Sequence, residues 1–285
     1  MTSTLSALLR AAAATLADAG VPTPEVDAEL LAAHAFGLSR GEVAAASIRG
    51  DAAPADTAAF AELLARRAAR EPLQHLTGLA PFRHLELAVG PGVFVPRPET
   101  ELVAQLAIDA LLAVPDAAPV AVDLGTGSGA IALAMATEVP HARVYAAESS
   151  ADAFGWTQRN FAAHAPHAHL AFADLADAFA DLDGTVAVVV SNPPYVPDDA
   201  IPRDPEVRLF DPPAALYGGV DGLDVVRVLS GVGMRLLRPG GTLVIEHGEW
   251  QGGPVRELLT ADGWRAAATH LDLTLRDRAT TALRP

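Results

Sequence analysis

The residues with the clearest chemical potential lie in the segment VVVSNPPYVP, residues 188–197. Its apolar, β-branched run is followed by Asn192, Pro193, Pro194 and Tyr195. Proline fixes φ and has no N–H, so two prolines in series predict a rigid turn whose carbonyl groups point outward. The side-chain carbonyl of Asn192 and a main-chain carbonyl of this turn can together hold both hydrogens of an –NH₂ group. Tyr195 offers a flat face to a planar substrate.

Such a pair of acceptors suits methyl transfer to a nitrogen that is a poor nucleophile. In an amide or an exocyclic amine the nitrogen lone pair is delocalised. Two fixed acceptors aim the nitrogen at a methyl sulfonium group and favour its pyramidalisation, through orientation and transition-state electrostatics. This chemistry needs no cysteine, serine–histidine or metal nucleophile. We therefore assign the catalytic role to residues Asn192, Pro193, Pro194 and Tyr195.

A second motif, VAVDLGTGSGAIALAMA, has the pattern of a strand, a tight glycine loop and a helix. Gly125, Gly127 and Gly129 permit a sharp turn and a close approach of the backbone to a ligand. Gly125, Gly127 and Ala130 also satisfy a loose dinucleotide fingerprint, so NAD is an alternative ligand. Two details favour S-adenosylmethionine: the glycines alternate strictly, and Asp123 ends the strand, where it can face a cationic or amino group.

Two further acids end the next two predicted strands. Glu148 follows a strand in the position expected for an acid that binds ribose hydroxyls, a role that serves NAD equally well. Asp174 ends the third strand and could accept a hydrogen bond from an adenine amino group. The alternative for Asp174 is a solvated acid at a strand end.

The elements that must position these residues alternate between strands and helices after residue 95. This alternation predicts a doubly wound, mostly parallel sheet with crossover helices. Ligands of such sheets bind beyond the carboxyl ends of the strands, where the Asn-Pro-Pro-Tyr turn lies. We expect seven strands, in the segments PVAVDLG, ARVYAAE, HLAFAD, TVAVVVSN, GTLVIEH, WRAAATHLDL and RATTALRP.

The first part of the chain, residues 1–78, has the pattern of a small helical bundle. Thr23 is a predicted N-cap before Pro24, and Ser39 with Glu42 forms a predicted capping box. The segment contains nine acids and six arginines, which does not suit a DNA-reading module. Residues 79–95 alternate and contain Gly and Pro, which predicts a β-hairpin linker, and residues 96–285 form the methyltransferase domain.

Composition narrows the class of protein. The 285-residue chain is 51% hydrophobic and has no cysteine, which excludes disulfides and thiolate metal sites. Its net charge of −15 argues against broad binding to nucleic acid or anionic membranes, although a local basic patch stays open. The first twenty residues have no basic leader, and no run approaches the length of a membrane span. We expect a cytoplasmic protein.

The motifs together resemble class I S-adenosylmethionine-dependent amino-methyltransferases with a Rossmann-like sheet. Beyond these motifs, nearly the whole chain resembles the PrmC/HemK family of release-factor glutamine N5-methyltransferases. Asn-Pro-Pro-Tyr alone is shared with DNA adenine and rRNA guanine methyltransferases, whereas PRPETE after a helical domain is much more specific. The similar segments are EVDAELLAAHAFGLSR, REPLQHLTGLAPFRHLELAVGPGVFVPRPETELV, VDLGTGSGAIALA, VVVSNPPYVP, GGVDGLDVVRVL, LRPGGTLVIEHGEWQG and DLTLRDRATTALRP.

The resemblance implies a substrate and a set of site residues. The substrate is the glutamine of the Gly-Gly-Gln motif in class I peptide chain release factors, which the helical domain would dock and whose methylation supports translation termination. S-adenosylmethionine would be converted to S-adenosylhomocysteine. The implied cofactor-binding residues are Asp123, Gly125, Thr126, Gly127, Ser128, Gly129, Glu148, Asp174, Leu175 and Asn192.

Three positions depart from the family pattern. Glu148 stands where an Asp is common, which lengthens the reach to the ribose, and Leu175 stands where some members have an aromatic residue, which weakens stacking on adenine. The segment DLTLRDR lacks the glycine that usually precedes its Arg-Asp-Arg. None of these departures removes a group that the chemistry requires.

Two other functions stay open at this point. A nucleic-acid amino-methyltransferase acting on adenine N6 or guanine N2 would flip a base against Tyr195, but the acidic charge and the absence of a basic recognition domain count against it. A non-catalytic module using the same fold would bind cofactor without turnover. The intact glycine loop and Asn-Pro-Pro-Tyr turn disfavour that reading.

Three weaker signals remain. His164, His167 and His169 have a spacing that could hold a metal, but we expect a surface loop there and predict no metal site. The group Glu246, His247 and Glu249 could be a ligand set, although a structural or substrate-rim role fits its place after a strand better. Arg97 could contact cofactor or substrate, or form a salt bridge with Glu99 or Glu101.

Overall fold

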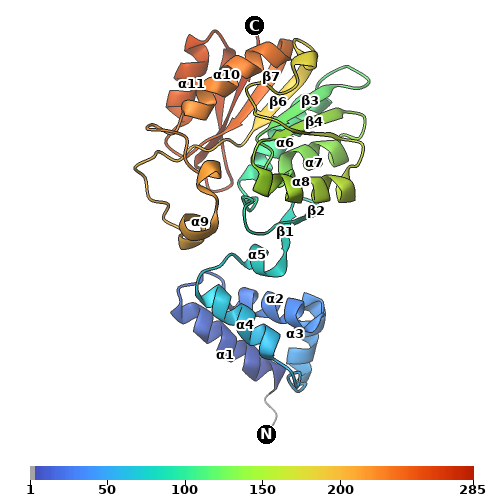
Figure 1. Ribbon diagram of the computed structural model, residues 1–285, viewed down its shortest axis with the longest axis vertical. Helices are drawn as coiled ribbons and strands as arrows, with labels where there is room; N and C mark the ends of the chain where they lie inside the picture. Colours follow the sequence, from blue (N-terminus) through green and yellow to red (C-terminus); the bar gives the residue numbers. More distant parts are fainter. Residues whose placement is uncertain (1–3) are drawn as a thin grey trace. The chain divides into compact units, whose positions relative to one another are not determined.

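The computed structural model describes residues 4–285, which divide into two compact units (Figure 1). A helical unit contains Met1–Leu79 together with Arg203–Phe210. A sheet unit contains Ala80–Pro202 and Asp211–Pro285. The chain therefore passes from one unit to the other three times. In the part of the chain that the structure describes, no helix has the length and apolar character needed to cross a lipid bilayer.

The helical unit is built from amphipathic helices with local capping signals. The predicted capping box is confirmed, since the Glu42 N–H donates to Ser39 Oγ at 3.2 Å and the Ser39 N–H donates to Glu42 Oε2 at 2.8 Å. Thr23 occupies the predicted N-cap position, but its hydroxyl donates to Asp27 at 2.8 Å instead of capping a backbone N–H. The helices of this unit are α1 (Leu5–Asp18), α2 (Pro24–Phe36), α3 (Arg40–Arg49), α4 (Ala58–Ala68), α5 (Leu73–Thr77) and α9 (Pro205–Phe210).

One apolar core holds this unit together. Leu5, Leu9 and Leu16 lie one or two turns apart on α1, so they form a single buried stripe. Leu31 of α2 and Phe60 of α4 are also fully buried and belong to the same core. The unit therefore has a core of its own, separate from that of the sheet.

The sheet unit contains a seven-stranded sheet in the order β5-β4-β3-β6-β7-β9-β8. Neighbouring strands from β5 to β7 pair in parallel, and β9 runs antiparallel to both of its neighbours. The expected doubly wound, mostly parallel sheet of seven strands is confirmed. Its strands are β3 (Val120–Leu124), β4 (Arg143–Glu148), β5 (His169–Phe172), β6 (Val186–Ser191), β7 (Leu237–Glu246), β8 (Arg265–Leu271) and β9 (Asp277–Leu283).

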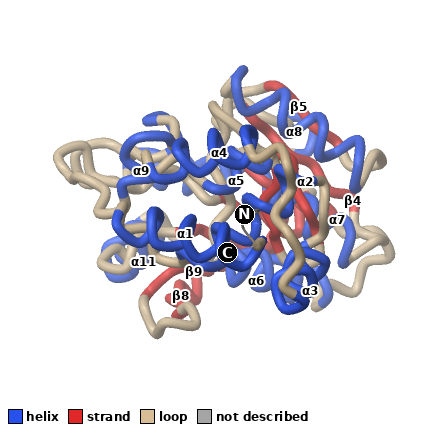
Figure 2. The backbone as a smooth tube through the Cα atoms, turned by 90° about the horizontal axis from the view of Figure 1, so that it is seen from below, coloured by secondary structure: helices blue, strands red, loops and turns tan. Residues whose placement is uncertain are grey.

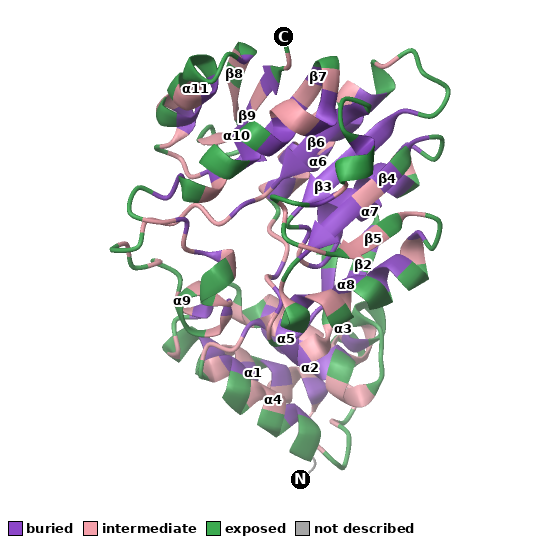
Figure 3. Ribbon diagram, turned by 45° about the horizontal axis from the view of Figure 1, so that its top comes forward, coloured by how far each residue is buried: buried purple, intermediate pink, exposed green. Residues whose placement is uncertain are grey.

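Helices cover both faces of this sheet. Ala121 belongs to one core with α6, α7 and α8, while Val120 and Val122 belong to the other with α10 and α11. Because successive side chains of a strand point to opposite faces, a strand covered on both faces is apolar throughout, and β3 and β6 are buried along their whole length (Figure 3). The helices are α6 (Thr100–Leu112), α7 (Ala130–Glu138), α8 (Ala151–His164), α10 (Asp224–Leu236) and α11 (Gly252–Ala261), with short 3₁₀ turns at Ala180–Leu182 and Pro213–Ala215.

The linker region is more irregular than the expected hairpin over 79–95. Only β1 (Leu79–Phe82) and β2 (Leu85–Ala88) pair as a two-stranded sheet. The remainder has no regular structure, but Val89, Val93 and Val95 are buried in a small core with Ala153 of α8. This segment is therefore packed into the sheet unit.

The topology brings the two sequence motifs together. The strand order reverses between β3 and β6, which are paired through Ala121–Val188, Val122–Val189 and Asp123–Val190. Ligands of open α/β sheets bind at such a reversal, beyond the carboxyl ends of the strands. The glycine loop follows β3 and the Asn-Pro-Pro-Tyr turn follows β6, so both motifs lie at this point of the sheet edge.

Candidate active site

The Asn-Pro-Pro-Tyr turn leaves the sheet at a strand end that is tied to its neighbour. Ser191, the last residue of β6, is fully buried, and its hydroxyl donates to the Leu124 carbonyl at 2.6 Å. Leu124 is the last residue of β3, so this bond fixes the two motif-bearing strand ends to each other. Ser191 was not among the predicted site residues, although a lone hydroxyl residue at the end of an apolar strand is a signal for such a contact.

Asn192 is oriented by a partner far away in the sequence. Its side-chain Nδ2 donates to Thr100 Oγ1 at 3.3 Å, and Thr100 is the buried first residue of α6. The amide group has one carbonyl and one NH₂, so engaging the NH₂ leaves the carbonyl oxygen available for a substrate N–H. Thr100 was missed in the sequence, where its only sign is its place in the PRPETE segment.

Tyr195 is held at both its hydroxyl and its main chain. The hydroxyl donates to Glu246 Oε1 at 3.3 Å, and Arg278 Nη1 lies 3.5 Å from the same oxygen. Burial and the neighbouring Glu246 raise the pKa of Tyr195, so the phenol stays protonated and remains a donor. The Tyr195 carbonyl accepts a hydrogen bond from Gln251 Nε2 at 3.0 Å. The ring is therefore a fixed wall of the site.

Two glycines of the GGVDGL segment allow another stretch of backbone to approach this turn. A Cβ at Gly218 would lie 2.4 Å from the Pro194 carbonyl oxygen, and one at Gly222 would lie 2.2 Å from that of Tyr195. Gly222 also has a φ of +73°, a conformation that favours glycine. Any side chain at either position would push the turn out of place.

The glycine loop has the shape of a ligand cradle. Gly125, Gly127 and Gly129 all have positive φ, at +72°, +58° and +88°. A Cβ added at Gly125 or Gly127 would meet open space, whereas one at Gly129 would lie 2.9 Å from the Phe161 ring. The first two glycines therefore present bare backbone outward, and the third allows close packing of helix α7.

Side chains from neighbouring elements hold this loop in one conformation. Glu148 accepts the Gly127 N–H at 2.8 Å with one oxygen and the Ser150 N–H at 2.7 Å with the other. On α8, Thr157 donates to the Gly127 carbonyl at 2.6 Å, and Asn160 donates to the Ser128 carbonyl at 2.9 Å. Thr157 and Asn160 were not recognised in the sequence.

Asp123 lies beneath the loop and is only 1% exposed. Its Oδ2 accepts from the Thr126 hydroxyl at 2.6 Å and from the Ala132 N–H at 3.1 Å. Within residues 4–285, its Oδ1 is buried without a hydrogen-bond partner. Burial raises the pKa of Asp123 to about 7, with a further contribution from Glu148, against the effect of the two hydrogen bonds. A cation above the loop would favour the ionised form.

Asp174 and Leu175 follow β5 at the same edge of the sheet. Asp174 is exposed, and its Oδ1 accepts the Ala176 N–H at 2.9 Å. Leu175 is half-buried and packs against the core beneath α10 and α11. β3, β4, β5 and β6 thus each bring predicted site residues to one edge, because parallel strands end on the same side.

Comparison with known proteins identifies the family. The PrmC N-terminal domain pattern matches residues 7–78, and the methyltransferase small domain pattern matches residues 85–216. The release factor glutamine methyltransferase of Streptomyces coelicolor is 53% identical over 270 residues, covering 94% of this chain and 93% of the relative. The chain belongs to the release factor glutamine methyltransferase family. The family member from Mycolicibacterium smegmatis is 46% identical and covers 98% of both chains.

Solved structures confirm the methyltransferase fold of this family member. A methyltransferase from Pyrococcus furiosus superposes with a TM-score of 0.51 at 18% identity, covering 80% of this chain and 99% of that chain. A 16S rRNA methyltransferase of T. thermophilus superposes with a TM-score of 0.52 at 22% identity, covering 73% of this chain and 50% of that chain. The resemblance to the release-factor-modifying family is thus confirmed by sequence, and the fold class by structure.

In this glutamine methyltransferase family member, Glu246 is a buried carboxyl behind the Asn-Pro-Pro-Tyr turn. It ends β7 and is 2% exposed. Burial raises the pKa of Glu246 to about 7, and Glu99 adds to the rise, while Thr100, Arg278 and Tyr195 lower it. Glu246 therefore acts on both sides of the turn, through Tyr195 directly and through Thr100, the partner of Asn192. The structural or substrate-rim role expected for Glu246 from the sequence did not include this connection to the turn.

The raised pKa makes the stability of the protein depend on pH at this site. An acid whose folded pKa lies above its unfolded value binds more protons in the folded state, so stability falls as pH rises between the two values. For Glu246 these values are 4.5 and about 7. We expect the melting temperature of the wild type to fall, relative to Glu246→Gln, as pH rises from about 4.5 to about 7. If the melting temperatures of the two proteins differed by the same amount at every pH in that range, this prediction would be wrong.

Three of the histidines that the sequence singled out as possible metal ligands make structural contacts instead. His164 Nε2 lies 2.9 Å from the Glu86 carbonyl, while His169 stacks on Tyr145 with ring centroids 4.4 Å apart. His247 is buried between the Gly248 carbonyl and the Thr280 hydroxyl, each at 2.9 Å. Between residues 4 and 285, no three His, Cys, Asp or Glu side chains gather in a way that could hold a metal ion.

Arg97 forms an ion pair, but with neither of the two partners expected from the sequence. Its Nη2 donates to Asp211 at 2.6 Å, and not to Glu99 or Glu101. The Asp211 side chain is wholly buried, and the Arg97 guanidinium also lies 5.0 Å from the centre of the Phe94 ring. The partner is 114 residues away in the sequence, so only the folded chain could reveal it.

Proposed function

We propose that this protein transfers a methyl group from S-adenosylmethionine to N5 of the glutamine in the Gly-Gly-Gln motif of class I peptide chain release factors. The N–CH₃ bond forms as the S–CH₃ bond breaks, so the reaction leaves S-adenosylhomocysteine and one proton released from the amide nitrogen. It supports translation termination in the cytoplasm. The observation that carries the proposal is the hydrogen bond from Asn192 Nδ2 to Thr100, which engages the NH₂ group and leaves the side-chain carbonyl oxygen to accept a substrate N–H. Family membership supplies the substrate class.

The residues of the turn perform the chemistry by orientation and electrostatics. Bound S-adenosylmethionine would supply an electrophilic methyl group. Asn192 Oδ1 would accept one N–H of the glutamine amide, and a main-chain carbonyl of the Pro193–Pro194 pair would accept the other. These two contacts orient the nitrogen lone pair and stabilise the positive charge that develops on nitrogen in the transition state. The fixed Tyr195 ring would pack against the planar amide.

The glycine loop fits the proposed cofactor. Gly125 and Gly127 present bare backbone on either side of Thr126, and Ser128 and Gly129 close the loop, so the methionine part can approach closely. The field of the buried Asp123 beneath them favours the cationic amino and sulfonium groups. Both Glu148 oxygens already accept one N–H, and each carboxylate oxygen has a second lone pair for a ribose hydroxyl.

The adenine would lie against the loop after β5. We assign Asp174 to the adenine amino group and Leu175 to its ring, because both follow a strand end at the same edge as the glycine loop. Leu175 offers an apolar contact without the stacking that an aromatic residue provides. The site needs no metal for this chemistry, since the reaction requires no Lewis acid and no activated water.

The test is methyl transfer from labelled S-adenosylmethionine to purified substrates. We expect label in an intact class I release factor, located by mass spectrometry at the glutamine of Gly-Gly-Gln, and none in ribosomal RNA or DNA. Label in nucleic acid and not in the release factor would favour a nucleic-acid amino-methyltransferase. Cofactor binding without transfer to any of them would favour a non-catalytic module. The acidic net charge of −15 favours the protein substrate.

A further inference from the structure

Helix α9 belongs by sequence to the methyltransferase part of the chain but folds with the helical unit. The segment Arg203–Phe210 leaves the sheet unit after Pro202 and returns to it at Asp211. It lies within the long connection between β6 and α10, with loop on both sides of it (Figure 2). The domain predicted over residues 96–285 included this segment, because nothing in its local pattern distinguishes it.

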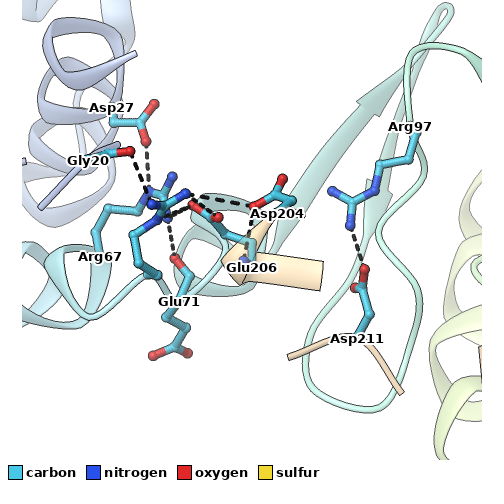
Figure 4. A network of polar contacts seen from close by, with 9 residues as sticks. Gly20, Asp27, Arg67, Glu71, Arg97, Asp204, Glu206 and Asp211 are labelled. Carbon is cyan, nitrogen blue, oxygen red and sulfur yellow. Dashed lines mark hydrogen bonds and ion pairs between the residues drawn. The ribbon is translucent and has the colours of Figure 1, made fainter. Parts of the chain in front are cut away.

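Glu206 makes the shortest contacts that hold α9 in the helical unit, and Asp204 adds a longer ion pair with Arg70 at 3.7 Å (Figure 4). Its Oε1 accepts from Arg67 Nη1 at 2.8 Å and from Arg70 Nε at 2.8 Å, and its Oε2 accepts from Arg70 Nη2 at 2.5 Å. Arg67 also donates to Asp27 at 2.7 Å and to the Glu71 carbonyl at 3.0 Å. Two arginines, one of them bidentate, thus surround a single carboxylate.

This cluster is buried, so its members depend on one another. The side chains of Arg67, Asp27 and Glu206 are 6%, 5% and 9% exposed. Removing one partner of a buried ion pair leaves an uncompensated charge, which is far more costly than losing an exposed pair. Burial alone would raise the pKa of Glu206, but the hydrogen bonds that it accepts, those of Arg70 and Arg67 among them, lower it to about 2. Because the lowered pKa keeps Glu206 ionised at neutral pH, the attachment persists there and weakens only in acid.

The loop that carries α9 is closed at its base, directly after the catalytic turn. The Val196 N–H donates to the Leu216 carbonyl at 2.8 Å, and the Gly218 N–H donates back to the Val196 carbonyl at 2.9 Å. Between this base and α9, residues 197–204 form the covalent connection on one side. A segment of this length spans at most about 29 Å when fully extended, and this limits how far α9 can move from the base.

We propose that Glu206 is a positioning residue that restrains the helical unit relative to the Asn-Pro-Pro-Tyr turn. One covalent connection, at Leu79–Ala80, would leave the helical unit free to rotate. Docking of α9 adds two further connections, both of which run back to the base of the loop beside Tyr195. The inference rests on the proposed function, because it assumes that the helical unit binds the release factor.

The restraint should act on the presentation of the substrate glutamine. A glutamine side chain alone offers few contacts, so its effective concentration at the turn depends on how closely the docked protein is held. When α9 is released, the helical unit is held by one connection and samples a larger volume. Transfer to an intact release factor should then slow, while a short Gly-Gly-Gln peptide, which does not use the helical unit, should react at an unchanged rate.

The experiment compares Glu206→Gln and Arg70→Ala with a matched control. Arg66→Ala removes an exposed pair with Glu71 on the same stretch of chain without touching α9. We expect both test variants to lower kcat/KM on an intact release factor by roughly tenfold to a hundredfold, mainly through KM. Cofactor affinity and kcat/KM on the peptide should stay within about twofold of wild type, and Arg66→Ala should match wild type throughout.

Hydrogen exchange and a second variant provide two further tests. Hydrogen exchange of residues 197–210 should accelerate in the test variants and not in the control. If Glu206→Gln does not fold, Arg70→Ala decides, because Arg70 is half-buried at 17% and its loss leaves Arg67 on the carboxylate. Unchanged kcat/KM on the release factor would refute the inference. A wild-type enzyme that binds cofactor and never methylates the release factor would instead refute the proposed function.

Discussion

Replacing Asn192 by alanine should lower the rate of methyl transfer by about 10²- to 10³-fold, the typical loss for one preorganised group that acts in the transition state. The side chain is held by Thr100 so that its carbonyl oxygen can accept a substrate N–H. Because that contact strengthens as charge develops on the amide nitrogen, its loss falls on the chemical step. Single-turnover rates with saturating cofactor and release factor measure this step directly.

A graded control tests the orientation itself. Thr100→Val removes the acceptor of the Asn192 NH₂ group but keeps the Asn192 carbonyl, so we expect a smaller loss of about tenfold. The affinity for S-adenosylmethionine should change little in either variant. An Asn192→Ala enzyme that kept more than about a third of the wild-type single-turnover rate would remove Asn192 from the catalytic group.

Replacing Glu148 by alanine should weaken S-adenosylmethionine binding by roughly tenfold to a hundredfold. Glu148 fixes the Gly127 and Ser150 N–H groups and is proposed to bind the ribose. Hydrogen bonds to a charged group contribute roughly 1.5 to 3 kcal/mol each, and about 1.4 kcal/mol corresponds to tenfold in affinity. Calorimetric titration of the wild type and of Glu148→Ala with S-adenosylmethionine gives the ratio of their dissociation constants.

A double comparison separates the ribose contact from the bracing of the loop. A cofactor analogue without ribose hydroxyls should bind the wild-type protein more weakly than S-adenosylmethionine does. The Glu148→Ala protein should bind the analogue and S-adenosylmethionine with equal affinity. Glu148→Asp, which keeps the charge on a shorter side chain, should fall between the two. If the analogue bound more weakly than S-adenosylmethionine by the same factor in both proteins, Glu148 would serve only to hold the loop.

Because α9 packs in the helical unit, deleting the N-terminal residues alone does not remove the whole unit. A deletion of residues 1–78 would take away Asp27, Arg67 and Arg70 and leave Glu206 without its buried partners. The exposed α9 would then be a loose insertion close in sequence to the Asn-Pro-Pro-Tyr turn. A truncation that is meant to test the helical unit alone should therefore also shorten the loop at residues 203–210.

The sequence by itself determined the features that depend on short-range rules. The capping box of Ser39 and Glu42, the glycine loop at Gly125 to Gly129 and the alternation that predicts a parallel sheet all arise within a few residues or a repeated period. The rigid Asn192–Tyr195 turn follows from the fixed φ of proline. Such features can be read locally because their stabilising contacts are local.

The tertiary structure alone decided which distant groups complete the site and how the units are joined. The Thr100 partner of Asn192 is 92 residues away, and the Arg70 partner of Glu206 is 136 residues away. In the sequence Glu206 resembles any exposed acid, and Glu246 resembles a rim residue. Both become buried only when remote elements pack on them, and burial is what makes a charge depend on one specific partner. No local pattern records that packing, so these contacts became visible only in the folded chain.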